Sequence, residues 1–271
     1  MAPSLQRVDQ LDDPRLAPYR DLRHAVHTPL SGLFVVEGRT LVARLAASRF
    51  PLLSLLVSER YVDQLPTDLP DHTPVFVIGH RDVDQLIGFH FHRGMLACGQ
   101  RLPDPDLAEL RGAAGAGSLW CICPRILDPT NLGSIIRNAA ALGATAVIVG
   151  PQSADPFSRR TIRVSMGAAL TLPIIRANDV PQTLMWLNQA GGVELMATVL
   201  QPDAEPLDRV LRPPHLGLVF GSEGEGLPDE WIALCQRRIT LPMDWQTDSL
   251  NVASATAVFL YHFARIAPAA S

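Results

Sequence analysis

Hydrophobic and polar positions follow a strand-then-helix pattern that repeats from residue 118 to the C-terminal end of the chain. Short apolar runs predict buried strands, among them SLWCIC, TAVIVG, VELMATVL and LGLVFG. Segments with helical spacing lie between or after them, among them NLGSIIRNAAALG, SRRTIRVSMGA, PDEWIALCQ and SLNVASATAVFLYHFARI. This alternation predicts a mainly parallel sheet with helices on both faces. Ligand-binding residues are expected where such strands end, at their carboxyl ends.

The first hundred residues predict a second, smaller α/β unit. Its strands are expected at LFVVEG, PLLSLLVS, TPVFVIG and GMLACG, and helices at GRTLVARLAAS and HRDVDQLIG. The stretch RLPDPDLAELRGAAGAGS that follows is rich in Pro, Gly, Ala and Asp, which is typical of a linker. We therefore predict a domain at 1–106, a linker at 107–118 and a second domain at 119–271, in line with the length of 271 residues.

Composition excludes several classes of protein. With 47% hydrophobic and 18% charged residues the chain is expected to fold, and no apolar stretch approaches the length of a membrane span. The first twenty residues contain acids and no apolar core of a signal peptide, so we expect a cytoplasmic protein. Cys121 and Cys123 alternate on one predicted strand, which favours buried thiols. The histidines lack the spacing of a zinc site, so no metal is predicted.

The charge pattern bears on nucleic-acid binding. The net charge is −4, which argues against binding by bulk electrostatics alone. All 23 basic residues are arginine, so lysine nucleophiles and Schiff bases are excluded. Arginine suits phosphate and base recognition, although a GC-rich genome produces the same bias. Residues 1–111 hold 12 arginines and 14 acids, and residues 112–271 hold 11 and 13, so each part has a net charge of −2.

Three loops of the second domain carry polar residues after predicted strands. DPTNLGSIIRNAAALGA opens a helix, with Thr130 or Asn131 expected as its N-cap. LVFGSEGEGLPDEW exposes backbone amides but lacks the GK[ST] of a nucleoside triphosphate loop, and it is not a GxSxG motif. ITLPMDWQTDSLNVASATA places Ser249 and Asn251 at the start of a helix of small residues. Such a helix can pack tightly against another chain or lie buried, and the sequence leaves both open.

Together the three loops resemble the signature motifs of the SpoU/TrmH family of RNA ribose 2′-O-methyltransferases, in the SPOUT superfamily. The first motif, NxGxxxR, is present as Asn131, Gly133 and Arg137. The second is VFGSEGEGLP at 219–228, and the third is LPM followed by SLNVASATA. The resemblance covers about 119–266. Residues 1–106 resemble, more loosely, the substrate-binding domain akin to small ribosomal RNA-binding proteins. Trp245 departs from the family, which often has a small residue there.

The resemblance implies a parallel-sheet methyltransferase domain with a deep trefoil knot that binds S-adenosylmethionine. Gly221, Leu241 and Leu250 would touch the cofactor through backbone and apolar groups, with Thr198 nearby. Family mechanisms assign activation of the ribose hydroxyl to the arginine that is here Arg137. A guanidinium rarely deprotonates, which favours stabilisation of a developing alkoxide over base catalysis.

The resemblance also suggests supporting residues and partners. Asn131 and Ser249 would position the arginine or the ribose, Asn251 would orient the loop, and Glu223 would fix the arginine or the glycine-rich loop. Independently of the resemblance, Arg159, Arg160 and Arg163 on one segment are candidate contacts with RNA phosphates, or else belong to a solvated helix face. Ribosomal RNA and transfer RNA are both open as substrates. Family members pair through the knotted domain, so we expect a homodimer that packs through the helix at 249–266.

Two other functions are weighed against this one. A non-catalytic RNA-binding scaffold of the same fold is disfavoured because the chain retains the residues of all three motifs. A nicotinamide-dependent oxidoreductase would share the alternation of strands and helices. It is disfavoured because no GxGxxG follows the first strand of the second domain.

Overall fold

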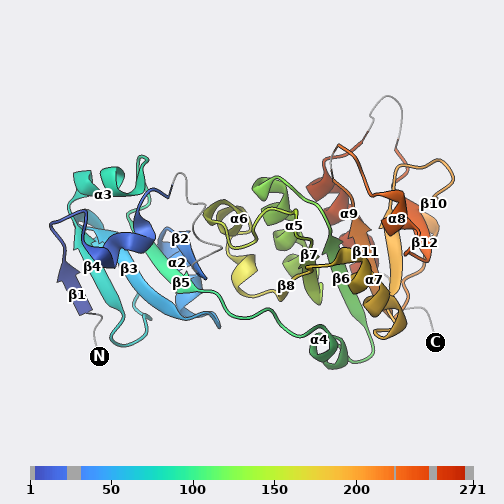
Figure 1. Cartoon of the computed structure of the whole chain (residues 1–271), viewed down its shortest axis with the longest axis horizontal. Coiled ribbons are helices and arrows are strands. Elements are labelled where there is room, and N and C mark those ends of the chain that lie inside the picture. Colours follow the sequence, from blue (N-terminus) through green and yellow to red (C-terminus); the bar gives the residue numbers. More distant parts are fainter. Residues whose placement is uncertain (1–3, 23–31, 223, 244–248, 266–271) are drawn as a thin grey trace. The chain divides into compact units, whose positions relative to one another are not determined.

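The computed structural model describes residues 4–22, 32–222, 224–243 and 249–265, and the chain forms two compact units. Unit 1 consists of residues 1–103 and 157–171, and unit 2 of residues 104–156 and 172–271. Figure 1 shows the elements of both units, which we describe separately. The domain prediction differs from this division, because it places residues 157–171 in the second domain, whereas they belong to unit 1.

Unit 1 is built on a five-stranded mixed sheet with the strand order β1-β4-β3-β5-β2. Strand β5 runs antiparallel to both of its neighbours, and the remaining pairs are parallel. The strands are β1 (Ser4–Arg7), β2 (Leu33–Glu37), β3 (Leu52–Ser58), β4 (Pro74–Ile78) and β5 (Met95–Gln100). The helices are α2 (Arg39–Ala46), α3 (His80–Ile87), α6 (Arg159–Val164) and the 3-10 turns η1 (Pro14–Tyr19), η2 (Glu59–Gln64) and η3 (Ala168–Leu170).

The segment 157–171 joins unit 1 through aromatic packing and a buried ion pair. The ring of Phe157 lies 5.5 Å from that of Phe34 and 5.3 Å from that of Phe50, between centroids. Arg159 Nη1 donates to the carboxylate of Glu37 at 2.5 Å, and the Glu37 residue is only 5% exposed. Sequence pattern alone could not place this segment, because the residues it contacts lie far away along the chain.

Unit 2 contains a seven-stranded sheet in which every pair of neighbouring strands is parallel, as predicted. The strand order is β10-β12-β9-β11-β6-β7-β8. The strands are β6 (Ser118–Cys123), β7 (Ala146–Val149), β8 (Ile174–Arg176), β9 (Glu194–Thr198), β10 (Glu205–Pro206), β11 (His215–Phe220) and β12 (Arg237–Thr240). Strands β6, β9 and β11 are adjacent, so the loops that follow β9 and β11 leave the same edge of the sheet as the loop after β6.

Helices cover both faces of this sheet (Figure 1). They are α4 (Leu107–Ala113), α5 (Pro129–Ala141), α7 (Val180–Gln189), α8 (Asp229–Ile232) and α9 (Val252–Arg265), with the 3-10 turn η4 (Leu207–Arg209). One apolar core includes side chains of α4, α7 and α8 together with Trp120, Ile122 and Val219 of the sheet. Helices α5 and α9 pack against each other. Phe220, which follows Val219 in β11, packs against Phe259 of α9, with 5.9 Å between the ring centroids. Because successive strand residues face opposite ways, α9 lies on the other face of the sheet.

Several predicted elements differ in detail from the structure. The predicted linker 107–118 contains α4, whose Leu107 and Leu110 pack against the core of unit 2, so this stretch is part of the unit. The predicted helix PDEWIALCQ is α-helical only over α8. The N-cap of α5 is Asp128 rather than Thr130 or Asn131, because its carboxylate accepts from the Thr130 amide at 2.7 Å and Pro129 occupies the first helical position.

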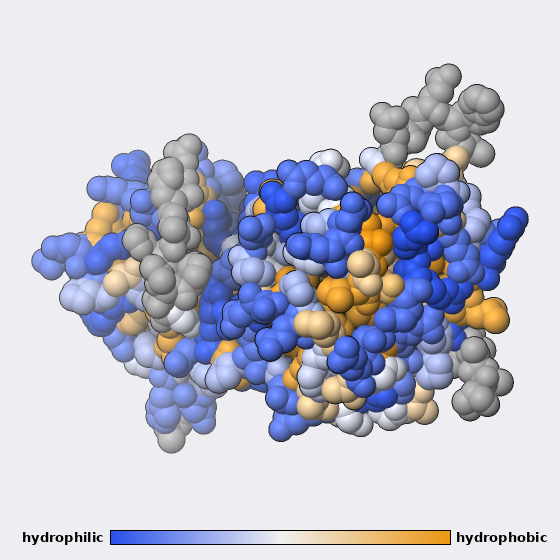
Figure 2. Space-filling model, turned by 45° about the vertical axis from the view of Figure 1, so that its right-hand side comes forward, coloured by the Kyte–Doolittle hydropathy of each residue, from blue (hydrophilic) through white to orange (hydrophobic). Residues whose placement is uncertain are grey.

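The buried thiols agree with the prediction for Cys121 and Cys123. Cys121 and Cys123 are both buried on one face of β6, with their Sγ atoms 3.9 Å apart. The hydrogen bond to Cys123 and burial raise the pKa of the Cys121 thiol well above its ordinary value. None of the described helices has the length and hydrophobicity needed to cross a bilayer. In the face that Figure 2 shows, hydrophobic side chains gather over unit 2, whereas the surface of unit 1 is mostly hydrophilic.

Candidate active site

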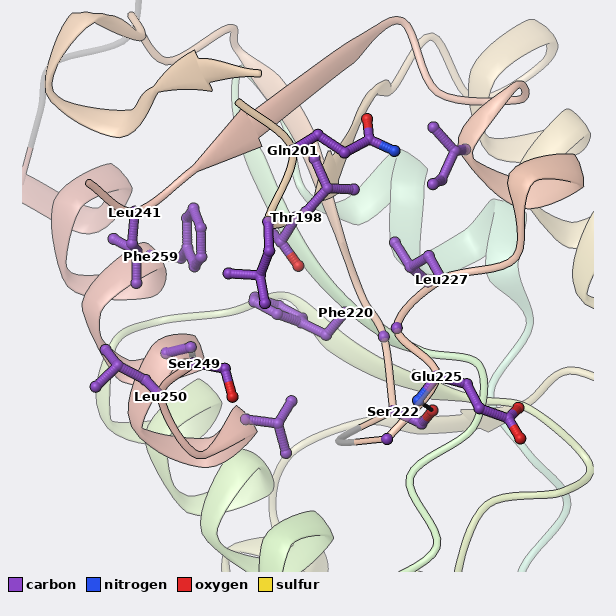
Figure 3. Close-up of a pocket in the computed structure, with 18 of the residues that line it drawn as sticks. Thr198, Gln201, Phe220, Ser222, Glu225, Leu227, Leu241, Ser249, Leu250 and Phe259 are labelled. Atoms are coloured by element: carbon purple, nitrogen blue, oxygen red, sulfur yellow. Dashed lines mark hydrogen bonds between the residues drawn. The ribbon is translucent and has the colours of Figure 1, made fainter. Parts of the chain in front are cut away.

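A cavity of about 400 Å³ opens in unit 2 where strands β9, β11 and β12 end. All four residues predicted to contact the cofactor line it: Thr198, Gly221, Leu241 and Leu250. They come from three strand ends and from the segment before α9, and Figure 3 shows the labelled side chains around one open space. Ser249, predicted to position the ribose or the arginine, also lines the cavity.

The walls of the cavity are mainly apolar and aromatic, and its lining also includes polar residues: Thr198, Gln201, Ser222, Glu225 and Ser249. Phe220, Phe259 and Leu227 line it beside the predicted leucines (Figure 3). The hydroxyl of Thr198 already donates to the carbonyl oxygen of Val219 at 3.0 Å. A ligand here would therefore meet hydrophobic side chains, several polar residues and the glycine-rich loop.

The glycine-rich loop folds back on itself beside the cavity. The amide of Ser222 donates to the carbonyl oxygen of Gly226, and the amide of Gly226 donates to that of Ser222, both at 3.1 Å. A Cβ on Gly221 would lie 2.4 Å from the carbonyl carbon of Gly226 and 2.7 Å from the amide nitrogen of Leu227. Glycine is therefore required at position 221 by close approach of two backbone segments.

A hydrogen bond joins the first and third motifs. Asn251 Nδ2 donates to Asn131 Oδ1 at 3.0 Å, and Asn251 Oδ1 accepts from the amide of Ala253 at 2.9 Å. The side chain of Asn251 thus caps the start of α9 while it holds the start of α5. Asn138 adds a second link, because its Nδ2 donates to the carbonyl oxygen of Ala253 at 3.0 Å. Two segments 120 residues apart are held together beside the cavity.

The remaining predicted catalytic residues stand apart from the cavity or outside the described residues. Arg137 lies on α5, is exposed, and does not line the cavity of its own chain. It has no hydrogen bond or ion pair with any residue that the structure describes. Glu223 and Trp245 lie outside the described residues. The catalytic roles assigned to Arg137 and Glu223 stay predictions.

Comparison with known proteins shows to which family the chain that forms this cavity belongs. Residues 118–261, more than half of the chain, match the model of the SpoU rRNA Methylase family. An uncharacterised tRNA/rRNA methyltransferase of Mycobacterium bovis is 38% identical over 96% of this chain and 92% of its own length. The chain belongs to the SpoU rRNA methylase family.

Two further relatives of this SpoU chain extend the likeness over almost its whole length. The 23S rRNA (guanosine(2553)-2′-O)-methyltransferase RlmP of Bacillus subtilis is 26% identical, over 95% of this chain and 99% of its own. The crystal structure of an AdoMet-bound rRNA methyltransferase from Sinorhizobium meliloti superposes with a TM-score of 0.82 at 26% identity, over 96% of this chain and 97% of that one. This SpoU protein is an RNA methyltransferase that depends on S-adenosylmethionine.

The cavity of this SpoU enzyme fits that cofactor by size and by lining. Small-molecule pockets measure about 300–1,000 Å³ and are mostly apolar with a few polar groups, often of the backbone. The cavity here has about 400 Å³, two phenylalanine rings, and the main chain of the glycine-rich loop. These walls would hold an uncharged ring system and orient a polar tail. The cofactor prediction is confirmed by the family membership and the AdoMet-bound structural neighbour.

Sequence reasoning missed an ion pair that ties the glycine-rich loop of this SpoU chain to the loop after β6. Arg125 Nη1 donates to the carboxylate of Glu225, which points away from the cavity in Figure 3. A smaller cavity of about 220 Å³ lies beside this pair and is also lined by Trp231. The backbone that carries Arg125 is pinned because Ser153 Oγ accepts from the Ile126 amide at 3.0 Å. The only sequence signal was an isolated charge directly after a buried strand.

The three predicted RNA contacts of this SpoU chain belong to unit 1, whereas the residues that line the cavity belong to unit 2. Arg160 and Arg163 are exposed on α6 and stay predicted contacts. Arg159 differs, because its guanidinium pairs with Glu37 and stacks on the Phe89 ring at 4.1 Å from the centroid. This arrangement gives Arg159 a structural role in holding α6.

Proposed function

We propose that this enzyme transfers the methyl group of S-adenosylmethionine to a ribose 2′-hydroxyl of structured RNA, ribosomal or transfer. The observation that carries the proposal is the convergence of the three motifs: residues of the second and third line one cavity, and Asn251 bonds Asn131 of the first. The name of the Bacillus relative, a 23S rRNA 2′-O-methyltransferase, supports the same chemistry.

The main role of the residues around the cavity is to orient the cofactor and the ribose hydroxyl relative to each other. When bound, the cofactor supplies an electrophilic methyl group on a sulfonium. The aromatic and leucine walls hold it in one pose, and alignment of nucleophile and carbon lowers the barrier by restricting their motion. Ser249, at the cavity, would hydrogen-bond the ribose, and the Asn131–Asn251 pair would keep the two motif loops at a fixed separation.

Arg137 would stabilise the negative charge that develops on the ribose oxygen. Guanidinium groups are not deprotonated in proteins, so Arg137 would act by charge and hydrogen bonding. Arg137 is exposed and lies off the lining of the cavity in its own chain. A homodimer that packs through α9 offers a second Arg137, on a helix that packs against α9. Val258 and Tyr261 on α9 are 45% and 60% exposed, which supports such a contact.

The test measures methyl transfer and its position. Nucleoside mass spectrometry of ribosomal and transfer RNA, treated with the enzyme and labelled cofactor, should find 2′-O-methylated ribose. We expect Arg137→Ala to lower turnover on the order of 10²-fold while the Kd for S-adenosylmethionine changes little. Methylation only on a base, or undiminished turnover of Arg137→Ala, would refute the proposal. A chain that binds no S-adenosylmethionine in calorimetry would instead be an RNA-binding scaffold.

Dimerisation is tested by light scattering and by complementation. We expect twice the monomer mass at micromolar concentration. If Arg137 serves the partner's cavity, mixing Arg137→Ala with an inactive Ser249→Ala, Leu250→Asp variant should restore part of the activity, because one mixed site carries both intact sets. Scattering at the mass of one chain would contradict this part. The deep trefoil knot and the cytoplasmic location stay predictions.

A further inference from the structure

The division of the chain into units redistributes its charge. By sequence halves each part has a net charge of −2, but unit 1 holds 14 arginines and 11 acidic residues, and unit 2 holds 9 and 16. The net charges are therefore +3 for unit 1 and −7 for unit 2. Segment 157–171 adds three arginines and no acid to unit 1, and residues 104–111, with a net charge of −2, pass to unit 2. A polyanion would be attracted to unit 1 and repelled by unit 2.

Two segments of unit 1 that lack exposed acids lie against each other. Residues 32–58, which include α2, contain one acidic residue, and this is the buried Glu37 that Arg159 neutralises. A Cβ on Gly167 would lie 3.0 Å from Leu41 Cδ2 and 3.1 Å from Arg44 Cδ, so the end of segment 157–171 touches α2.

The contact between these segments brings exposed arginines of both into one region. The amide of Gly167 donates to the carbonyl oxygen of Ile162 at 2.9 Å, which places Gly167 against the last turn of α6. Arg160 and Arg163 are exposed one turn apart on that helix, and Arg44 is exposed on α2. The pair of Arg159 with Glu37 fixes α6 from its buried side. These contacts hold the helix that carries Arg160 and Arg163 against the rest of unit 1.

We propose that Arg44, Arg160 and Arg163 form one binding surface for the phosphate backbone of the RNA substrate. The inference rests on the proposed function and adds where the RNA is held. Guanidinium groups bind phosphate oxygens through paired N–H donors. Neither of the two segments carries an exposed carboxylate that would repel a phosphate group. The surface reads no base sequence; it supplies affinity and register.

The experiment compares two triple variants of equal charge. Arg44→Gln, Arg160→Gln and Arg163→Gln are combined in one protein, and the exposed Arg60, Arg81 and Arg209 are changed to Gln in a matched control. Binding of a fluorescein-labelled RNA hairpin is measured by anisotropy over a range of salt concentrations. Melting curves show whether both variants fold as the unmodified protein does, and each single Gln variant is measured as well.

The salt dependence of binding reports how many phosphates the protein neutralises. For a duplex, one phosphate contact fewer lowers the slope of log K against log salt by about 0.9. We expect the slope to fall by about 2 to 3 in the first triple variant, by about 1 in each of its single variants, and by less than 1 in the control. A first variant with the slope of the control, or of the unmodified protein, would overturn the inference. Methyl transfer by the unmodified enzyme is measured in parallel: its absence would refute the proposed function, whatever the salt slopes show.

Discussion

Replacement of Gly221 by alanine tests whether the shape of the glycine-rich loop sets cofactor affinity. Carbon atoms in contact normally lie about 3.5–4.0 Å apart, but the new methyl would lie 2.4 Å from the carbonyl carbon of Gly226. The obstacle is backbone, and Gly226 is tied to Ser222 by two hydrogen bonds. The loop must therefore move as a unit, and it forms one wall of the cavity.

The size of the effect follows from this overlap. Forcing one extra methyl into a packed site costs about 1–3 kcal/mol. If the loop yields, the cost appears in binding, and about 1.4 kcal/mol per factor of ten gives a Kd for S-adenosylmethionine raised by about 5- to 150-fold. If the loop stays in place, the same cost appears as lower stability. Calorimetry with the cofactor measures the loss of binding free energy and urea denaturation measures the loss of stability, and the two losses should add up to the whole cost.

The same loop offers a matched control. A Cβ on Gly224 would meet no atom of the protein within 4 Å, and its φ lies outside the left-handed region, so Gly224→Ala should leave the stability and the shape of the loop nearly unchanged, although Gly224 also lines the cavity. Gly221→Ala that binds the cofactor normally and unfolds at the normal urea concentration would refute the reasoning. Equal losses in both variants would do so as well, because they would point to general sensitivity of the loop.

Three further substitutions probe contacts of the two units. Glu37→Ala should destabilise unit 1 by about 3 kcal/mol in urea denaturation, because it leaves Arg159 without the buried carboxylate that holds it; unchanged stability would contradict this. Asn251→Ala should cost about 1 kcal/mol of stability because α9 then begins without its cap, and Asn251→Asp, which keeps the cap, should recover most of it. Arg125→Ala should weaken S-adenosylmethionine binding about two- to fivefold by freeing the loop, since exposed ion pairs contribute up to about 1 kcal/mol. Glu225→Ala should weaken binding by the same factor, and the double variant should bind no more weakly than either single variant.

The sequence predicted those parts of the fold that depend on local pattern. Continuous apolar runs marked the central strands of unit 2 because both faces of a parallel sheet are buried, as SLWCIC shows for β6. Strand β1 and the two-residue β10 were not predicted. β1 is four residues long and largely exposed, so its sequence carries little hydrophobic signal.

The site was predictable where a motif carried it and hidden where contacts at long range decide. Thr198, Gly221, Leu241 and Leu250 follow from the resemblance of the motifs, and the cavity gathers all four. The Arg125–Glu225 pair joins residues 100 positions apart, and no local pattern announces such a contact. The membership of segment 157–171 in unit 1 escaped prediction for the same reason. The residues that it contacts are far away in the sequence and come close only in the folded chain.

The route of the chain also limits how this protein can be taken apart. The polypeptide passes between the units at 103–104, 156–157 and 171–172. A fragment that stops at Pro103 would leave the buried Glu37 with Arg93, at 3.7 Å, but without the closer Arg159, and would strip the Phe157 ring from Phe34. Neither fragment from a single cut in the chain would correspond to one of the two units. Separate production of the N-terminal unit would require residues 157–171 to be grafted onto its end.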